Sequence, residues 1–140
     1  MKYLYMIVLA VLSVQAIADD FDSLKEVRAF TDKTMDLFVQ KRFSEGLSAA
    51  KAYWPLPKEE IDGLVDQINQ QWSIVDQRFG KTTGKEFVRS EKIGESFIRY
   101  YYLHKFENHA IYWRFGFYKP KNKWQINSIV FLDDLEILFK

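Results

Sequence analysis

The second half of the chain has the period-two alternation of apolar and polar positions that is typical of β-strands. From Glu86 to Phe131, β-branched and aromatic residues predominate, and such side chains suit a pleated, half-buried surface. Breaks fall at Gly94, at residues 107–109 and at residues 119–122. Short strands separated by such turn clusters are typical of hairpins. We therefore expect one curved antiparallel sheet of about four strands.

A loop over residues 119–122 gives the most consistent pairing of the last two strands. It places Phe117 opposite Trp124 and Phe115 opposite Ile126, and paired positions share a face of the sheet. The expected apolar face is then Ile111, Trp113, Phe115, Phe117, Trp124, Ile126 and Val130. The expected opposite face is Tyr112, Arg114, Tyr118, Gln125 and Asn127, with Ile129 and Phe131 as apolar exceptions.

The preceding strand allows two alternatives, because the turn near residues 107–109 can hold two or three residues. A two-residue turn at Asn108 and His109 would place on the apolar face Ile98, Tyr100, Tyr102, His104 and Phe106. A three-residue turn would place there Phe97, Tyr101 and Leu103 instead. We favour the first alternative, although both faces of this strand are partly apolar.

The segment before the sheet has the 3.6-residue period of amphipathic helices. Residues 19–42 predict a first helix. Asp20 and Asp22 crowd its start together with Asp19, where negative charge complements the helix dipole. Ser44 is the expected cap of a short second helix. That helix ends near Trp54, because residues before a proline avoid the helical region.

A third helix is predicted from Pro57 to Gly80. Proline is tolerated in the first turn of a helix, and glycine is common just past its end. Beyond the sheet, Asp133 and Glu136 have the spacing of a capping box for a last short turn.

Residues 1–18 predict a secretory signal peptide. Lys2 is the positive start, residues 3–14 are apolar, and Ala16-Ile17-Ala18 is a small-x-small cleavage signal. An uncleaved membrane anchor is the alternative, but the apolar run is shorter than the roughly 20 residues of a spanning helix. We therefore expect cleavage after Ala18, a periplasmic or secreted protein, no membrane association after cleavage, and one domain over residues 19–140.

Charge and cysteine content narrow the classes of function. The chain has 20 basic and 19 acidic residues, and removal of Lys2 leaves 19 of each. A neutral protein lacks the basic face that nucleic-acid binding requires, so we expect no nucleic-acid partner. The chain contains no cysteine, which excludes disulfides and a thiol nucleophile. We expect no cofactor.

Helices followed by a curved antiparallel sheet indicate an α+β fold. The run Trp113–Lys119, then Trp124-x-Ile126 and Phe131, resembles the nuclear-transport-factor-2-like superfamily. These are cystatin-like, cone-shaped folds, and the chain looks like their small exported bacterial members of unassigned function. The resemblance implies a pocket between the helices and the concave sheet face. Because the superfamily includes both enzymes and non-catalytic binding or dimerising modules, the fold does not settle the function.

The residues expected to line that pocket are Trp72, Tyr100, Tyr102, His104, Trp113 and Phe115. The isomerases of the superfamily use an aspartate base and a tyrosine donor, but the acids in the sheet region before Leu132 are all glutamates. We therefore assign no catalytic residue. His104 is a candidate for titration near neutral pH, but we favour the alternative of a hydrogen-bonded structural histidine. His104 and His109 flank a turn, and their side chains are expected on opposite faces of the sheet. A metal site would also need further ligands, so we expect no metal ion.

Arg114 is expected on the face opposite the apolar set, near Arg99 or Tyr101, as a candidate contact for an anionic group. The apolar residues on that outer face suggest a homodimer interface. The sequence favours an exported, non-enzymatic module that binds a small apolar ligand or a protein partner. The alternatives are an isomerase-like or hydrolytic enzyme with an acid–base site in the cone, and an inhibitor or accessory subunit.

Overall fold

The computed structural model describes residues 20–140, so the predicted signal peptide lies outside the described residues. The described chain contains three α-helices followed by four strands and a final short 3-10 helix. The helices are α1 (Leu24–Val39), α2 (Phe43–Ala50) and α3 (Lys58–Phe79). The strands are β1 (Thr82–Ile93), β2 (Phe97–Phe106), β3 (Ala110–Tyr118) and β4 (Gln125–Leu132), and η1 (Leu135–Phe139) follows. The expected α+β class and the helices-first order are confirmed.

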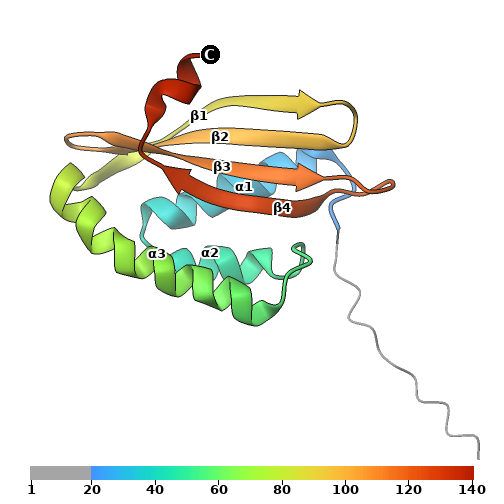
Figure 1. Cartoon of the computed structure of the whole chain (residues 1–140), viewed down its shortest axis with the longest axis horizontal. Helices are drawn as coiled ribbons and strands as arrows, with labels where there is room; N and C mark the ends of the chain where they lie inside the picture. The colour runs from blue at the N-terminus through green and yellow to red at the C-terminus, as the bar shows by residue number, and fades with distance from the viewer. Residues whose placement is uncertain (1–19) are drawn as a thin grey trace, which may run out of the picture.

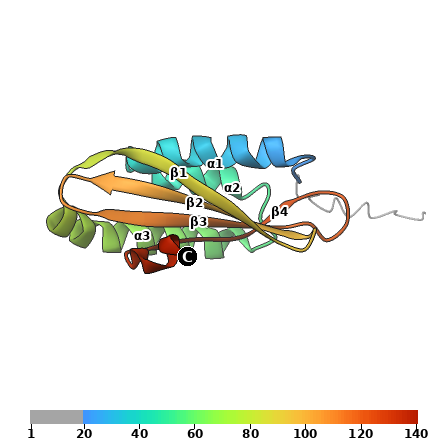
Figure 2. The same ribbon diagram turned by 90° about the horizontal axis from the view of Figure 1, so that it is seen from above.

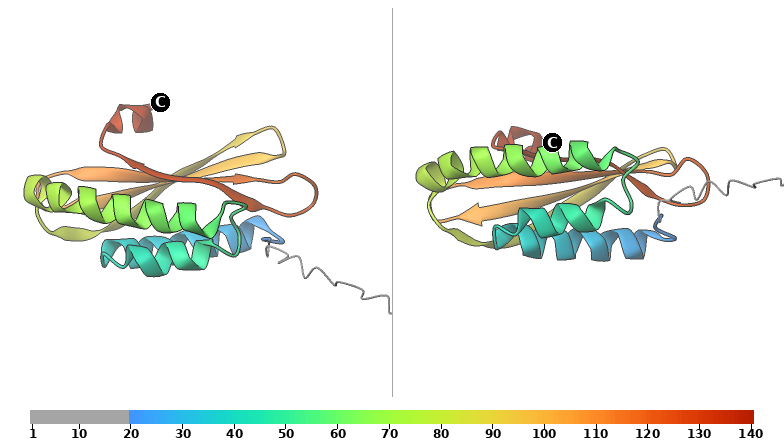
Figure 3. Two further views of the ribbon diagram at one scale, coloured as in Figure 1. Left: turned by 60° about the horizontal axis from the view of Figure 1, so that its bottom comes forward. Right: turned by 90° about the horizontal axis from the view of Figure 1, so that it is seen from below.

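The four strands form one antiparallel sheet in the order β1-β2-β3-β4. All three α-helices lie against one face of this sheet, which we call the inner face (Figures 1 and 3). The C-terminal η1 lies on the other side, which we call the outer face (Figure 1). Seen from above, α1 follows the β1 side of the twisted sheet and α3 follows the opposite side (Figure 2). Within residues 20–140, no helix is long and apolar enough to span a bilayer.

Helix α1 starts later than the sequence pattern predicted. The Ser23 side chain accepts a hydrogen bond from the Glu26 N–H at 3.2 Å, so Ser23 is the N-cap. A serine oxygen that reaches the third residue of a helix satisfies one of its free N–H groups. Asp22 therefore precedes the cap rather than sitting in the first turn.

Two other predicted caps are shifted by one or two residues. The N-cap position of α2 is Arg42, with no side-chain cap, so the prediction of Ser44 was wrong. In η1 the capping oxygen belongs to Asp134, which accepts from the Glu136 N–H at 3.1 Å, and not to Asp133. The predicted end of α3 at Gly80 is confirmed, because its φ of 85° is a conformation that glycine adopts at low cost.

The loop between β3 and β4 is longer than expected. Phe117 pairs with Ile126 and Tyr118 pairs with Gln125, so the predicted pairing of Phe117 with Trp124 was wrong. Trp124 instead forms a bridge with Phe21, with backbone hydrogen bonds of 2.8 and 2.9 Å. This bridge fixes the chain before α1 against the start of β4.

A β-bulge in β4 changes which of its side chains face the helices. Gly116 pairs with Ser128 while Phe117 pairs with Ile126, so Asn127 is an extra residue. One extra residue reverses the alternation beyond it. Ile129 and Phe131 therefore share the inner face with Phe115 and Trp113, whereas Val130 lies opposite Arg114. The prediction of Val130 inside, with Ile129 and Phe131 outside, was wrong.

The predicted inner face of β2 is confirmed, although its turn is not. Tyr102 pairs with Trp113 and Tyr100 pairs with Phe115. The Phe106 N–H donates to the His109 carbonyl at 2.9 Å, so the two turn residues are Glu107 and Asn108 rather than Asn108 and His109. This difference shifts the pairing of β2 with β3 by two residues. Because side chains alternate with a period of two, the same side chains of β2 remain on the inner face.

Candidate functional site

The six residues predicted to line an interior pocket are all buried on the inner side of the sheet. They pack against one another and against the helices: the Trp72 and Trp113 rings lie 6.2 Å apart, and the Tyr102 and Phe115 rings 5.8 Å apart. Phe38 of α1 lies 4.4 Å from the Trp113 ring. Of the six, Trp113 alone borders one of the three hollows described below. Their pocket-lining role stays a prediction.

His104 is held between two hydrogen-bonding partners in this core. Trp113 Nε1 donates to His104 Nδ1 at 3.2 Å, and His104 Nε2 lies 3.1 Å from the Thr82 hydroxyl. An indole N–H can only donate, so Nδ1 carries no proton and Nε2 carries one. Burial lowers the pKa of His104 to about 4, although the charge of Asp76 opposes this shift. The ring is therefore neutral and structural at pH 7.

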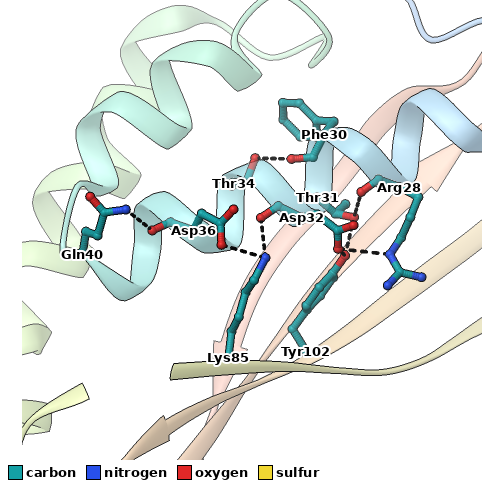
Figure 4. A network of polar contacts seen from close by, with 9 residues as sticks. All are labelled: Arg28, Phe30, Thr31, Asp32, Thr34, Asp36, Gln40, Lys85 and Tyr102. Carbon is teal, nitrogen blue, oxygen red and sulfur yellow. Dashed lines mark hydrogen bonds and ion pairs between the residues drawn. The ribbon is translucent and has the colours of Figure 1, made fainter. Parts of the chain in front are cut away.

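A second polar network ties α1 to the sheet (Figure 4). The Tyr102 hydroxyl donates to Asp32 Oδ1 at 2.5 Å and lies 2.8 Å from the Thr31 hydroxyl. Arg28 Nε donates to the same Asp32 oxygen at 3.1 Å. Lys85 of β1 donates to the Asp32 carbonyl at 2.9 Å. These contacts connect α1 to both β1 and β2.

Asp32 and Tyr102 form an aspartate–tyrosine pair that the sequence pattern did not indicate. The acids considered for such a pair were those of the sheet region, whereas Asp32 lies on α1. The only local signal is its spacing of four residues from Arg28. Partial burial raises the pKa of Asp32, but the hydrogen bonds from Tyr102 and Arg28 outweigh burial and lower it. Burial and the bond to Asp32 raise the pKa of Tyr102. A weakly basic carboxylate that is already bonded to its own donor is suited to docking α1 rather than to proton abstraction.

The outer face is partly covered by the C-terminal segment. Arg89 of β1 donates to the backbone carbonyls of Leu138 at 2.7 Å and of Ile137 at 3.1 Å. Its guanidinium also lies 4.9 Å from the centre of the Tyr101 ring. Tyr101 is consequently buried although it faces away from the helices.

The remaining part of the outer face contains a hollow of about 380 Å³, which we call the outer groove. Its lining residues are Glu91, Lys92, Ile93, Phe97, Ile98, Arg99, Gly116 and Asn127. Glu91, Arg99 and Gly116 occupy one row across the sheet. Ile93 pairs with Phe97 in the next row, and the Ile93 side chain is 66% exposed. The groove therefore combines an apolar wall with charged groups.

Arg114 lies beside the outer groove, on the same strand and face as Gly116. It pairs with Tyr101, and Arg99 pairs with Gly116, so the expected position of Arg114 near these residues is confirmed. The Arg114 Nε atom is buried, with no hydrogen-bond partner among the described residues. A buried donor without a hydrogen-bond partner lowers the stability of the folded protein. The missing acceptor of this atom therefore needs an explanation.

A third region of interest lies between α3 and β4, and we call it the edge groove. It consists of two hollows of about 240 and 180 Å³ that share Gln71 and Phe131. Ile74 and Leu132 border it and are 56% and 44% exposed. Because β4 is at the edge of the sheet, one side of its backbone is not paired with another strand.

No group of three or more histidine or acidic side chains within residues 20–140 is arranged to hold a metal ion. The chain matches no protein-family model, no curated protein and no solved structure. The function is therefore argued from the geometry of the described residues.

Proposed function

We propose that this protein is an exported, non-enzymatic binding module whose ligand occupies the outer groove. The observation that supports this is the composition of the groove: Ile93 and Phe97 form an apolar wall, and charged groups lie next to them. Its volume of about 380 Å³ exceeds the 240 and 180 Å³ of the edge-groove hollows. Small-molecule sites are commonly mostly apolar hollows of roughly 300 to 1,000 Å³ with a few polar groups.

The state of the inner polar groups favours binding over catalysis. His104 accepts from Trp113 and lies beside Thr82, so neither ring nitrogen is free. Asp32 is bonded to Tyr102 and to Arg28. A general base must reach the proton that it removes. His104 is buried with both ring nitrogens engaged, and Asp32 is held by Tyr102 and Arg28 through its Oδ1 atom.

The exposed isoleucines offer a matched test of the site. Ile93 borders the outer groove and Ile74 borders the edge groove, and both are mostly exposed, so replacing either with serine has little effect on folding. Binding of the neutral apolar dye N-phenyl-1-naphthylamine is measured by its fluorescence. We expect Ile93→Ser to weaken binding about fivefold, because part of one apolar side chain is lost from the contact, and Ile74→Ser to leave it unchanged.

The two variants separate the competing sites. Dye binding that is unchanged in Ile93→Ser would refute the outer groove as the ligand site. Dye binding that is weakened in Ile74→Ser instead would move the site to the edge groove. Each variant is checked for an unchanged unfolding midpoint, so that a loss of binding is not a loss of folding.

A second candidate function, binding of a protein partner, is favoured by the contrast between the two edges of the sheet. Strand β1 carries five charged residues and two register shifts, which discourage pairing with another strand. Strand β4 has no charged residue between Gln125 and Leu132. An extended apolar segment of a partner could pair with β4 and place alternate side chains in the two hollows of the edge groove. This reading predicts that Ile74→Ser, and not Ile93→Ser, abolishes partner binding.

A further inference from the structure

The outer face around the groove has more guanidinium groups than carboxylates. Arg99 lines the groove and pairs with one acid, Glu91, whereas Lys92 pairs with Ile98 of the inner face. Glu91 already lies 3.7 Å from Arg89. Arg114 adds a further guanidinium on the same face. Neither Arg99 nor Arg114 forms an ion pair with another residue in the described part of the chain.

We propose that the ligand of the outer groove is an amphipathic organic anion, whose carboxylate is bound by Arg99 and Arg114 and whose apolar chain lies against Ile93 and Phe97. This inference rests on the proposed function, because it names the chemical class of ligand for the same groove. Guanidinium groups bind carboxylates through short, charge-assisted hydrogen bonds. The groove supplies both halves of the recognition, an apolar wall and a cationic end.

The register places the two arginines close enough to share one anion. Arg99 pairs with Gly116, and Arg114 precedes Gly116 by two residues on the same face. Diagonal neighbours of this kind have backbones roughly 7 Å apart, a distance that two long arginine side chains can close around one carboxylate.

Gly116 leaves room for the side chain of Ser128, its partner on β4. A Cβ atom at this position would lie 2.5 Å from Ser128 Oγ. Glycine within a strand often marks a bulge, and the β4 bulge lies opposite Gly116.

The buried Nε of Arg114 is the second observation that points to an anion. The atom has no acceptor among the described residues. A buried polar donor is normally hydrogen-bonded. Because this atom is not exposed to solvent, a bound carboxylate reaches it only when the Arg114 side chain turns toward the groove. Arg89 differs, because its guanidinium is already bonded to the carbonyls of Ile137 and Leu138.

The test compares octanoate with 1-octanol as competitors of the bound dye at pH 7.5 and low salt. The two molecules have chains of the same length and differ in charge. We expect octanoate to bind the unaltered protein about five- to tenfold more tightly than octanol, as one charge-assisted contact at a partly exposed site predicts. Arg99→Gln and Arg114→Gln should each remove this preference, and Lys105→Gln, an exposed residue of β2 outside the lining of the groove, should keep it.

Equal competition by octanol and octanoate, with Ile93→Ser still weakening both, would overturn the anion and leave the proposed function intact. Competition that Ile93→Ser does not weaken would refute the proposed function itself. Inorganic phosphate alone should not displace the dye; displacement of the dye by phosphate would show that the groove binds free anions without an apolar chain and would overturn the amphipathic ligand. Arg99 is exposed, so Arg99→Gln tests the proposal even if Arg114→Gln fails to fold.

Discussion

At the scale of single residues, His104 shows how a titratable group becomes structural when it is buried. Its Nδ1 accepts from Trp113, and its other nitrogen faces Thr82. Protonation would place a second N–H against the indole N–H, where no acceptor exists. Burial lowers the pKa of His104 to about 4, and the ring is the hydrogen-bonded structural histidine that the sequence favoured over a group titrating near neutral pH.

This lowered pKa gives the stability a defined pH dependence. The unfolded chain binds a proton at His104 below about pH 6.5, whereas the folded chain does not until about pH 4. Stability is therefore fully present above pH 6.5 and falls as the pH is lowered toward 4. We expect His104 to account for a loss of about 2 to 3 kcal/mol between pH 7 and pH 4.5, measured by urea unfolding.

The matched control for this prediction is His104→Gln. Glutamine can accept from Trp113 Nε1 and donate to Thr82 but does not titrate. Both proteins contain the same carboxylates, including Asp76 and Asp32, so the difference between their pH profiles isolates His104. Parallel profiles for the two proteins would show that His104 does not carry this dependence.

At the scale of secondary-structure elements, the bulge in β4 decides which side chains form the core. Ile129 lies on the inner face and is buried, whereas Val130 lies opposite Arg114 and is only partly buried. We expect Ile129→Asn to lower the free energy of unfolding by about 3 kcal/mol, since it removes apolar contacts and buries an amide. Val130→Asn should cost about 1 kcal/mol or less.

Urea unfolding of the two asparagine variants measures this difference directly. The register expected from simple alternation predicts the reverse order, with Val130 the more sensitive position. A larger loss for Val130→Asn than for Ile129→Asn would therefore contradict the bulge.

The elements that could be predicted from the sequence were those with local signals. Pro57 and Gly80 bound α3, and the inner face of β2 follows from alternation together with a two-residue turn before β3. The register of β4 could not be predicted in the same way. Asn127 and Ser128 are adjacent polar residues between two isoleucines, and this break in the alternation does not by itself show that the strand contains an extra residue.

The candidate site was predicted only in part, for a related reason. The position of Arg114 near Arg99 and Tyr101 followed from strand parity and is confirmed. The outer groove itself depends on Gly116 and on the end of the β1–β2 hairpin, and a hollow requires three-dimensional packing that periodicity does not contain. Arg89 also binds the C-terminal segment that covers Tyr101. This contact joins residues far apart in the sequence, so periodicity does not predict it either.

At the scale of the whole molecule, the two faces of the sheet have different roles. The inner face packs its aromatic residues against α1, α2 and α3, and the polar groups of His104 and Tyr102 are hydrogen-bonded within the protein. The outer face is covered by η1 over one part (Figure 1). Another part of it contains the outer groove. We infer that the helices stabilise the sheet and that its opposite side is available for a ligand.

The measurement that tests this division most directly is a map of backbone amide chemical shifts during a titration with octanoate. We predict changes that are confined to residues 91–99 and to the amides around Gly116 and Arg114, with the indole signals of Trp72 and Trp113 unchanged. Changes centred on those two indoles and on Tyr102 would contradict the account, because they would place the ligand between the helices and the sheet.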